Sequence, residues 1–388
     1  MWQSGIPSEI LCMVGALLSK EPGSSKAGRL VCRSWASGIA EGTTKLSLGR
    51  RTGQPGLFML FRNAEYVSYS TAPEGLRELR ELRELRRLRR LRVPACTDDL
   101  LTGISVQWLE LVSGPKVTSI GRIGCLTCIV RLDLVGCDTL TGHFKLSGAD
   151  VPSLQTLNMS SCCQLTRVDV RMSVTLRHLD LRACAGLARL GLVAVAALET
   201  VDLRDCHRFE SLRAVRTHAI SRLDMSNCYR VSDLMLRNFR SLRSLVMVKC
   251  YRITRLRISN LAALELIDFR SCDNLAFLGL TNLSSLKRAS LADCDSLERL
   301  ETARLPALSS LDLSGCYSLA AIDNLRDLTA LRSLSLDNCH ALLGAALAGI
   351  GNLYNLEALD VDGCGEMSNA VAKEIESLPG LRSARSEK

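Results

Sequence analysis

The chain has 388 residues, of which 47% are apolar but only 4% aromatic, so aliphatic side chains must form most of its core. Its best apolar run, residues 190–198, is far shorter than the roughly 20 residues that cross a bilayer, and this excludes a membrane-spanning helix. The net charge of +9 is local, and the first residues lack a basic flank followed by an apolar stretch, so the sequence predicts an intracellular protein, cytoplasmic or nuclear.

Residues 6–40 predict two short helices. The first begins near Pro7, because proline is tolerated in the first turn of a helix, and continues with apolar residues at helical spacing. A Gly/Ser/Lys-rich linker over residues 19–28 ends it, and the second helix carries Trp35. Two helices of this length cannot bury their apolar faces alone. Residues 1–44 are therefore expected to form a helical module that packs against another surface.

An arginine-rich stretch follows at residues 76–92. It contains eight arginines and three glutamates, with leucine at every third residue. The leucines are expected to point inward, and the charged residues between them to form the solvated flank of a packed layer. No aromatic residue interleaves the arginines to stack on a base, so this stretch does not predict a nucleic-acid partner.

A cysteine recurs with a fixed period through the rest of the chain, preceded by the run Leu-x-x-Leu-x-Leu-x-x-Cys, in which Val, Ile, Met or Phe replaces some leucines. From Cys162 to Cys316 seven successive intervals are 22 residues long. The series is Cys137, Cys162, Cys184, Cys206, Cys228, Cys250, Cys272, Cys294, Cys316, Cys339 and Cys364. Upstream, the run can be traced to Cys96 and Gly114, with degenerate strands at residues 46–48 and 67–69. A fixed period of this length indicates a solenoid.

The spacing within one unit predicts a strand. In residues 176–182, Leu179 and Leu181 point to the core, while the residues between them point to solvent. One such strand per unit gives a parallel inner sheet. The outer side has too few residues for a long crossover helix and is expected to hold short turns, 3₁₀ segments or brief strands.

The run Leu308-Ser309-Ser310-Leu311-Asp312-Leu313-Ser314-Gly315-Cys316 resembles the leucine-rich repeat in its cysteine-containing form. Over residues 88–365 the resemblance implies an α/β solenoid, a horseshoe with a parallel inner sheet and short outer turns, behind a small helical N-terminal module. We expect the module at residues 1–44, the solenoid at 45–365 (regular from about residue 88) and a C-terminal helical cap and tail at 366–388. Within the last part, residues 366–378 predict an amphipathic helix that Pro379 ends, and the tail from Ser383 is expected to be loose.

The repeat cysteines are expected to be buried and reduced. Disulfides between equivalent cysteines would fit only some layers, whereas a thiol can fill a tight interior corner and bond a backbone carbonyl of the next turn. This role suits a reducing compartment. Cys125 and Cys128 form a single C-x-x-C pair without a second pair at zinc spacing, so no metal and no cofactor are predicted.

The N-terminal helices resemble the F-box, with Ile6-Pro7-Ser8-Glu9 at the start and Leu30-Val31-Cys32-Arg33-Ser34-Trp35 as the second signature. The resemblance implies docking on the Skp-type adaptor and the cullin scaffold of an SCF-type ubiquitin ligase. The adaptor-contacting residues that it implies are Ile6, Pro7, Ile10, Leu11, Val14, Leu17, Leu30, Val31 and Trp35. The alternative is a helical cap that only shields the first layer.

An F-box followed by leucine-rich repeats implies the substrate-recognition adaptor of a cullin–RING ubiquitin ligase, which binds its target through the repeat surface. The alternative is an intracellular leucine-rich-repeat scaffold or regulatory subunit without a ligase role. The sequence has no Gly-rich phosphate loop and no H-E-x-x-H motif, so the chain is not expected to be an enzyme.

One cluster departs from the repeat consensus, because His or Tyr followed by Arg comes after three consecutive repeat cysteines. Stacking of units predicts a short ladder on the rim where each inner strand ends, beside an apolar spot. Tyr and Arg dominate binding hot spots, and clustered Arg suits a carboxylate or phosphate. The residues predicted to bind an acidic or phosphorylated substrate protein are Arg182, Arg204, His207, Arg208, Tyr229, Arg230, Val246, Val248, Tyr251 and Arg252. The alternative is sequence drift among duplicated repeats.

Overall fold

The computed structural model describes residues 45–48, 63–69, 82, 85, 87–94, 106–112, 126–232, 234, 236, 239–365 and 369–385. It divides into two compact units, residues 1–165 and 166–388. In both, the strand that precedes each repeat cysteine belongs to an inner face, and the segment that follows the cysteine belongs to an outer face. No helix in these described ranges is long and apolar enough to cross a bilayer.

In the first unit the inner strands pair in parallel and in chain order. They are β1 (Lys45–Leu48), β2 (Tyr66–Tyr69), β3 (Arg90–Pro94), β4 (Trp108–Val112), β5 (Arg131–Asp133) and β7 (Thr156–Asn158). A 3₁₀ helix, η4 (Leu126–Cys128), precedes β5, and β6 (Gly142–Ser147) lies on the outer face. The degenerate runs at residues 46–48 and 67–69 are therefore strands of the same kind as the regular ones.

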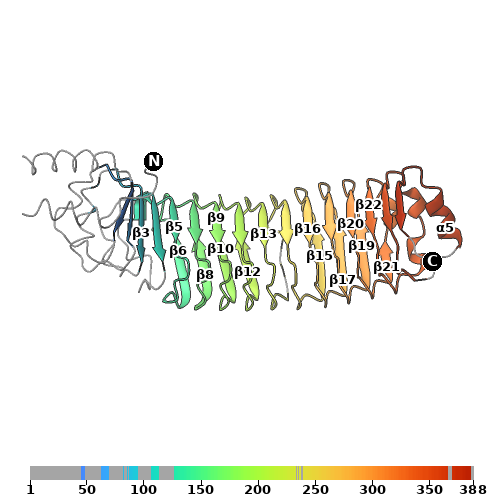
Figure 1. Cartoon of the computed structure of the whole chain (residues 1–388), viewed down its shortest axis with the longest axis horizontal. Coiled ribbons are helices and arrows are strands. Elements are labelled where there is room, and N and C mark those ends of the chain that lie inside the picture. The colour runs from blue at the N-terminus through green and yellow to red at the C-terminus, as the bar shows by residue number, and fades with distance from the viewer. Residues whose placement is uncertain are drawn as a thin grey trace, which may run out of the picture. The chain divides into compact units, whose positions relative to one another are not determined.

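In the second unit the inner strands again pair in parallel, each with the strand of the next repeat. They are β9 (His178–Asp180), β11 (Thr200–Asp202), β13 (Arg222–Asp224), β14 (Ser244–Val246), β16 (Leu266–Asp268), β18 (Arg288–Ser290), β20 (Ser310–Asp312), β22 (Ser333–Ser335), β23 (Ala358–Asp360) and β24 (Ser383–Arg385). Inner and outer strands form two rows in Figure 1. The parallel-strand solenoid predicted from the period is confirmed.

Brief strands and 3₁₀ helices form the outer face, as expected from the short unit. The strands are β8 (Leu165–Arg171), β10 (Arg189–Val193), β12 (Ser211–Val215), β15 (Arg255–Ser259), β17 (Phe277–Thr281), β19 (Arg299–Ala303) and β21 (Ala321–Asp323). The 3₁₀ helices are η5 (Leu325–Asp327), η6 (Gly344–Leu347) and η7 (Ile350–Asn352). In β10, for example, Leu190 and Leu192 are buried, so each layer of the core receives side chains from both faces.

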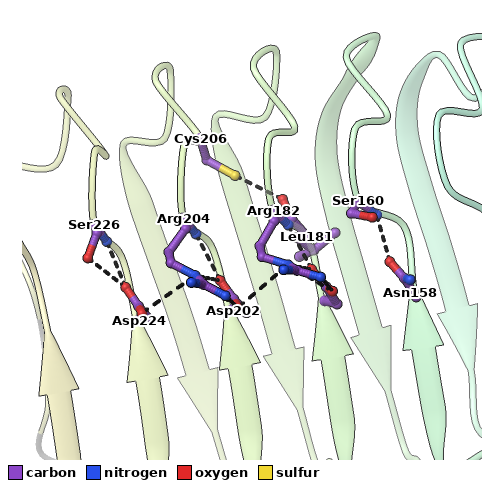
Figure 2. A network of polar contacts seen from close by, with 10 residues as sticks. Asn158, Ser160, Leu181, Arg182, Asp202, Arg204, Cys206, Asp224 and Ser226 are labelled. Carbon is purple, nitrogen blue, oxygen red and sulfur yellow. Dashed lines mark hydrogen bonds and ion pairs between the residues drawn. The ribbon is translucent and has the colours of Figure 1, made fainter.

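The repeat cysteines form a buried ladder that runs through the core. The thiol of Cys206 donates a hydrogen bond to the carbonyl oxygen of Leu181 at 3.1 Å, and Cys228 does the same to Leu203 at 3.2 Å. Figure 2 shows the first of these bonds. In both cases the acceptor lies in the preceding repeat. The expectation that the thiol would bond a carbonyl of the next turn is therefore wrong in its direction. Each thiol thereby satisfies the hydrogen-bonding need of a carbonyl group at the end of an inner strand, where the chain leaves the parallel sheet.

Two corners in the repeat adopt left-handed backbone conformation. The first is the residue before the repeat cysteine, for example Asn227 at φ 61° and Lys249 at φ 59°. The second follows the outer strand, for example Ala194 at φ 54° and Asn282 at φ 57°. Such a corner turns the chain sharply between faces, and Gly, Asn and Asp occupy it with least strain. The short unit is thus closed by two tight turns.

A helix covers the last layers of the second unit. The helix α5 (Asn369–Glu376) lies inside the segment predicted to be amphipathic, and its Val371 is buried. Glu374 Oε2 accepts hydrogen bonds from the backbone N–H groups of Gly349 (3.1 Å) and Gly351 (3.2 Å), which ties α5 to η7. The expectation of a loose tail from Ser383 is wrong for Ser383–Arg385, because these residues form β24 and pair with β23.

Candidate protein-binding surface

The predicted ladder is a stacked column of rings on the rim of the second unit. The rings of His207 and Tyr229 are 4.7 Å apart and nearly parallel, and those of Tyr229 and Tyr251 are 5.3 Å apart. Each residue directly follows a buried cysteine, so consecutive units bring the three rings into register. His207 Nδ1 lies 3.1 Å from the carbonyl oxygen of Asn227, and this contact requires Nδ1 to carry the hydrogen. We call these three residues the ring ladder.

Beside the ring ladder runs a column of arginines, Arg208, Arg230 and Arg252, which we call the arginine column. All three are exposed. Arg230 lies 3.8 Å from Glu210, an open contact between two well-exposed side chains. Among the described residues, neither Arg208 nor Arg252 has an ion pair or hydrogen bond. Among the residues that the structure describes, the positive charge of this column is therefore largely uncompensated.

Some charged columns of the second unit are compensated from one repeat to the next. Glu265 accepts hydrogen bonds from Arg243 at 2.6 Å and from Lys287 at 2.9 Å, on either side of it. Arg177 pairs with Glu199 in the same way. These contacts lower the pKa of the Glu265 carboxyl group, mainly through the bond from Lys287. In the arginine column, three arginines follow one another at equivalent repeat positions with no carboxylate between them in the column.

The structure places Arg182 and Arg204 in a different setting. Arg182 forms hydrogen bonds of 2.7–3.0 Å to Asp180 on its own strand, and Arg204 forms bonds of 2.6–3.1 Å to Asp202. Longer contacts join each guanidinium group to the aspartate of the following repeat, Arg182 to Asp202 at 3.7 Å and Arg204 to Asp224 at 3.6 Å. Figure 2 shows this series of alternating aspartates and arginines, which we call the staircase. The hydrogen bonds that these two arginines donate to the aspartates raise the pKa of both guanidinium groups.

The staircase therefore neutralises these two arginines within the sheet. They lie close to the ring ladder in sequence, but their guanidinium groups are already held by carboxylates. An anionic partner would have to compete with two hydrogen bonds of good geometry at each of them. In the arginine column, by contrast, Arg208 and Arg252 have no carboxylate partner among the described residues, and Arg230 has one distant contact, with Glu210.

Val246 and Val248 occupy positions where the neighbouring repeats carry polar or charged residues. Val246 pairs in register with Asp224 on one side and with Asp268 on the other. Both valines are half-buried. They interrupt the column of aspartates and arginines on the inner face.

Two further groups of aromatic residues were not identified from the sequence. Tyr317 and His340 stack at 5.4 Å, at the same position after the cysteine as the ring ladder. Reading that one position through all repeats would have found them. In the first unit, the guanidinium group of Arg90 lies over the rings of Tyr66 (4.8 Å) and Trp108 (3.5 Å). These rings come from irregular repeats, whose register could not be assigned without the strands.

The predicted adaptor-contacting residues, from Ile6 to Trp35, lie outside the described residues, as does Cys125 of the C-x-x-C pair. The second cysteine of that pair, Cys128, is exposed at the end of η4.

No protein-family model and no curated protein matches the chain. Among solved structures it is similar to the functional domain of InlJ from Listeria monocytogenes, described as including a cysteine ladder, with 15% identity over 91% of this chain and 70% of that one and a TM-score of 0.34. A leucine-rich-repeat protein from Leptospira interrogans shares 16% identity over 94% and 100% of the two chains, with a TM-score of 0.32. Another, from Bacteroides ovatus, shares 12% over 89% and 84%, with a TM-score of 0.23.

The strands supply the fold assignment for this chain. Among the described residues, the runs of Leu-x-x-Leu-x-Leu-x-x-Cys form inner strands that pair in parallel with the equivalent strand of the next repeat, and most end in a buried cysteine. The chain has the fold of the leucine-rich-repeat proteins, a solenoid of parallel strands.

Proposed function

We propose that the protein binds other proteins through the ring ladder and the arginine column. The observation that carries this proposal is the positive charge of Arg208 and Arg252, which have no ion pair within the described part of the chain, beside a stack of rings. Tyr and Arg contribute a large share of the energy in protein interfaces, and a stacked ring loses little conformational freedom when a partner binds. The partner is acidic or phosphorylated, because guanidinium groups pair best with carboxylate and phosphate.

Replacing Tyr229, Tyr251 and Arg252 together with alanine tests this proposal. Hot-spot residues each contribute about 2 kcal/mol or more, so the variant should bind at least about 100-fold more weakly than the unmodified chain. Binding of a labelled polyglutamate peptide, followed by fluorescence anisotropy, measures the loss. The three side chains lie on the surface, and circular dichroism should show an unchanged fold.

A control variant, Arg326→Ala with Tyr354→Ala, removes an exposed arginine and an exposed tyrosine elsewhere on the same unit. The exposed fraction of the Arg326 side chain is 70%, and that of Tyr354 is 61%. This variant should bind the peptide like the unmodified chain. Equal binding by the triple variant and the unmodified chain would contradict the proposed surface.

We further propose that the N-terminal residues 1–44 dock on a Skp-type adaptor, so that the chain serves as the substrate receptor of a cullin–RING ubiquitin ligase inside the cell. The support is the resemblance of residues 6–9 and 30–35 to the F-box and their place before leucine-rich repeats. The alternative is a scaffold or regulatory subunit without a ligase role, in which the same residues cap the solenoid.

A pull-down with purified Skp-type adaptor separates these two functions. The intact chain should retain the adaptor, and the variant Leu11→Ala with Trp35→Ala should lose it, because both side chains belong to the apolar faces that would contact the adaptor. The control variant described above should retain it. If the intact chain does not bind the adaptor, the scaffold function replaces the ligase function.

A further inference from the structure

Arg208 and Arg252, for which the described residues supply no ion pair or hydrogen bond, occupy equivalent positions two repeats apart. Arg208 is the second residue after Cys206, and Arg252 is the second residue after Cys250. The inner strands before these cysteines, β11 and β14, are separated only by β13. Neighbouring strands lie about 4.8 Å apart, so the two guanidinium groups start from backbone positions about 9.6 Å apart.

The middle arginine and the rings fill the space between them. Arg230 is near Glu210, which leaves the outer two as the stronger anion sites. The tyrosine rings stack face to face, so their edges and hydroxyl groups, rather than their faces, are turned to a partner. A phenol hydroxyl group donates a hydrogen bond, and a guanidinium group carries several donors. The surface is therefore rich in donors along its whole length.

The ends of this surface limit what it can hold. Beyond Tyr251 the next residue in the column is Asp273, whose pKa is raised by burial and by the nearby Asp295. An anionic partner is disfavoured there when these carboxyl groups are ionised. Before His207 the corresponding positions are Ala185 and Gly186, which offer no donor side chain. The anion-binding stretch thus begins at Arg208 and ends at Arg252.

We propose that this surface binds an extended polyproline II segment of a partner protein that carries two anionic side chains three residues apart. This inference rests on the proposed function. A polyproline II helix has three residues per turn and rises about 3.1 Å per residue, so residues i and i+3 share one side at a spacing of about 9.3 Å. That spacing matches the separation of the two arginines, and one anionic side chain pairs with each.

Other backbone conformations fit less well. In a β-strand the residues on one side are spaced by two, at about 6.7 Å, or by four, at about 13 Å, and neither matches. An α-helix places residues i and i+7 about 10.5 Å apart, close to the required distance. However, its backbone carbonyl groups are already bonded within the helix, whereas those of a polyproline II segment are free to accept from the tyrosine hydroxyls and Arg230.

Labelled proline-rich peptides that carry two glutamates at spacings of two, three or four residues test the inference, together with an alanine-based helical peptide that carries them seven apart. All four have the same charge. The peptide with spacing three should bind at least about tenfold more tightly than the others. Its advantage should disappear in Arg208→Ala and in Arg252→Ala and persist in Arg213→Ala, which removes an exposed arginine of the outer strand β12. Phosphoserine in place of glutamate shows whether phosphate or carboxylate is preferred.

Equal binding at all spacings, or tightest binding of the helical peptide, overturns the inference. If polyglutamate binds to the unmodified chain in these cases, the proposed binding surface stands and only the spacing is wrong. If neither polyglutamate nor any of the spaced peptides binds, both proposals fail.

Discussion

The free energy of unfolding of the second unit should fall steeply as the pH rises above about 9. Burial raises the pKa of the Cys206 and Cys316 thiols to about 12 and that of Cys364 to about 11. Burial also raises the pKa of the Cys228 and Cys339 thiols. An unfolded chain has thiols with a pKa of about 8.5.

The sign follows from which state loses protons. Between the unfolded and the folded pKa, the unfolded chain ionises its thiols while the folded chain keeps them neutral, so rising pH favours unfolding. The stabilisation is complete below about pH 8.5, and each thiol then removes about 1.4 kcal/mol per pH unit until the folded pKa is passed. Several thiols titrating together remove as much as the whole stability of a typical domain, about 5–15 kcal/mol, within one or two pH units.

Urea denaturation at about pH 8, 9 and 10 measures this slope. In the variant Cys206→Ala with Cys316→Ala, two of the responsible groups are absent, so the slope should become shallower by about 1.4 kcal/mol per pH unit for each. Cys128→Ala removes an exposed thiol and should leave the slope unchanged. Tyrosines and lysines titrate equally in all variants and cancel in the comparison. Identical slopes in all three proteins would show that the ladder thiols are not the cause.

Phe269→Ala should lower the free energy of unfolding by about 3–5 kcal/mol at neutral pH. Phe269 is 1% exposed and is among the largest fully buried side chains of the described core. Its ring belongs to a thin layer of the core between two neighbouring repeats, in which Met247 and Leu291 hold the position that is equivalent to Phe269. A thin layer can collapse only slightly, because its neighbours are held by the strand pairing on both sides, so a cavity remains.

Because each repeat contacts only its neighbours, this loss stays local and should divide the unfolding of the second unit into two transitions. Differential scanning calorimetry of the full chain would show two unfolding peaks of the second unit in Phe269→Ala and one in the unmodified chain. Leu343→Ala, at a side chain that is 60% exposed, should change the free energy of unfolding by less than about 0.5 kcal/mol. A single unshifted peak in Phe269→Ala would refute the argument.

The repeat made most of the fold predictable. The cysteine period defined the strands, and the alternation of leucines within each run defined their buried sides. The C-terminal strand escaped prediction, because β24 joins the sheet through its backbone and carries no leucine run. The outer strands could be expected only as one of several short elements, since five residues of alternating pattern are compatible with a strand or a turn.

The ring ladder was predictable because equal spacing from a cysteine places side chains in one column. Which aspartate holds Arg182 and which holds Arg204 was not predictable, because the same spacing allows an arginine to bond the next strand or its own. In the structure each guanidinium group turns back to the aspartate two residues earlier. This choice depends on side-chain torsion angles, which the amino-acid sequence does not reveal. Tyr317 and His340 were within reach of the same reasoning but are separated from the ladder by Asp273 and Asp295.

The ion pairs between neighbouring repeats have a consequence for how the chain finds its correct stacking order. If one whole repeat were looped out, the cysteine ladder would re-form without penalty, since the thiol of Cys250 would find the carbonyl of Leu203 where Cys228 now finds it. The charges would not re-form: omitting the repeat that contains Glu265 would bring Arg243 against Lys287. Exposed ion pairs add little to the stability of the correct stack. Where they occur, they instead favour the correct neighbour over the next copy but one, and so disfavour a stack in which a repeat is skipped.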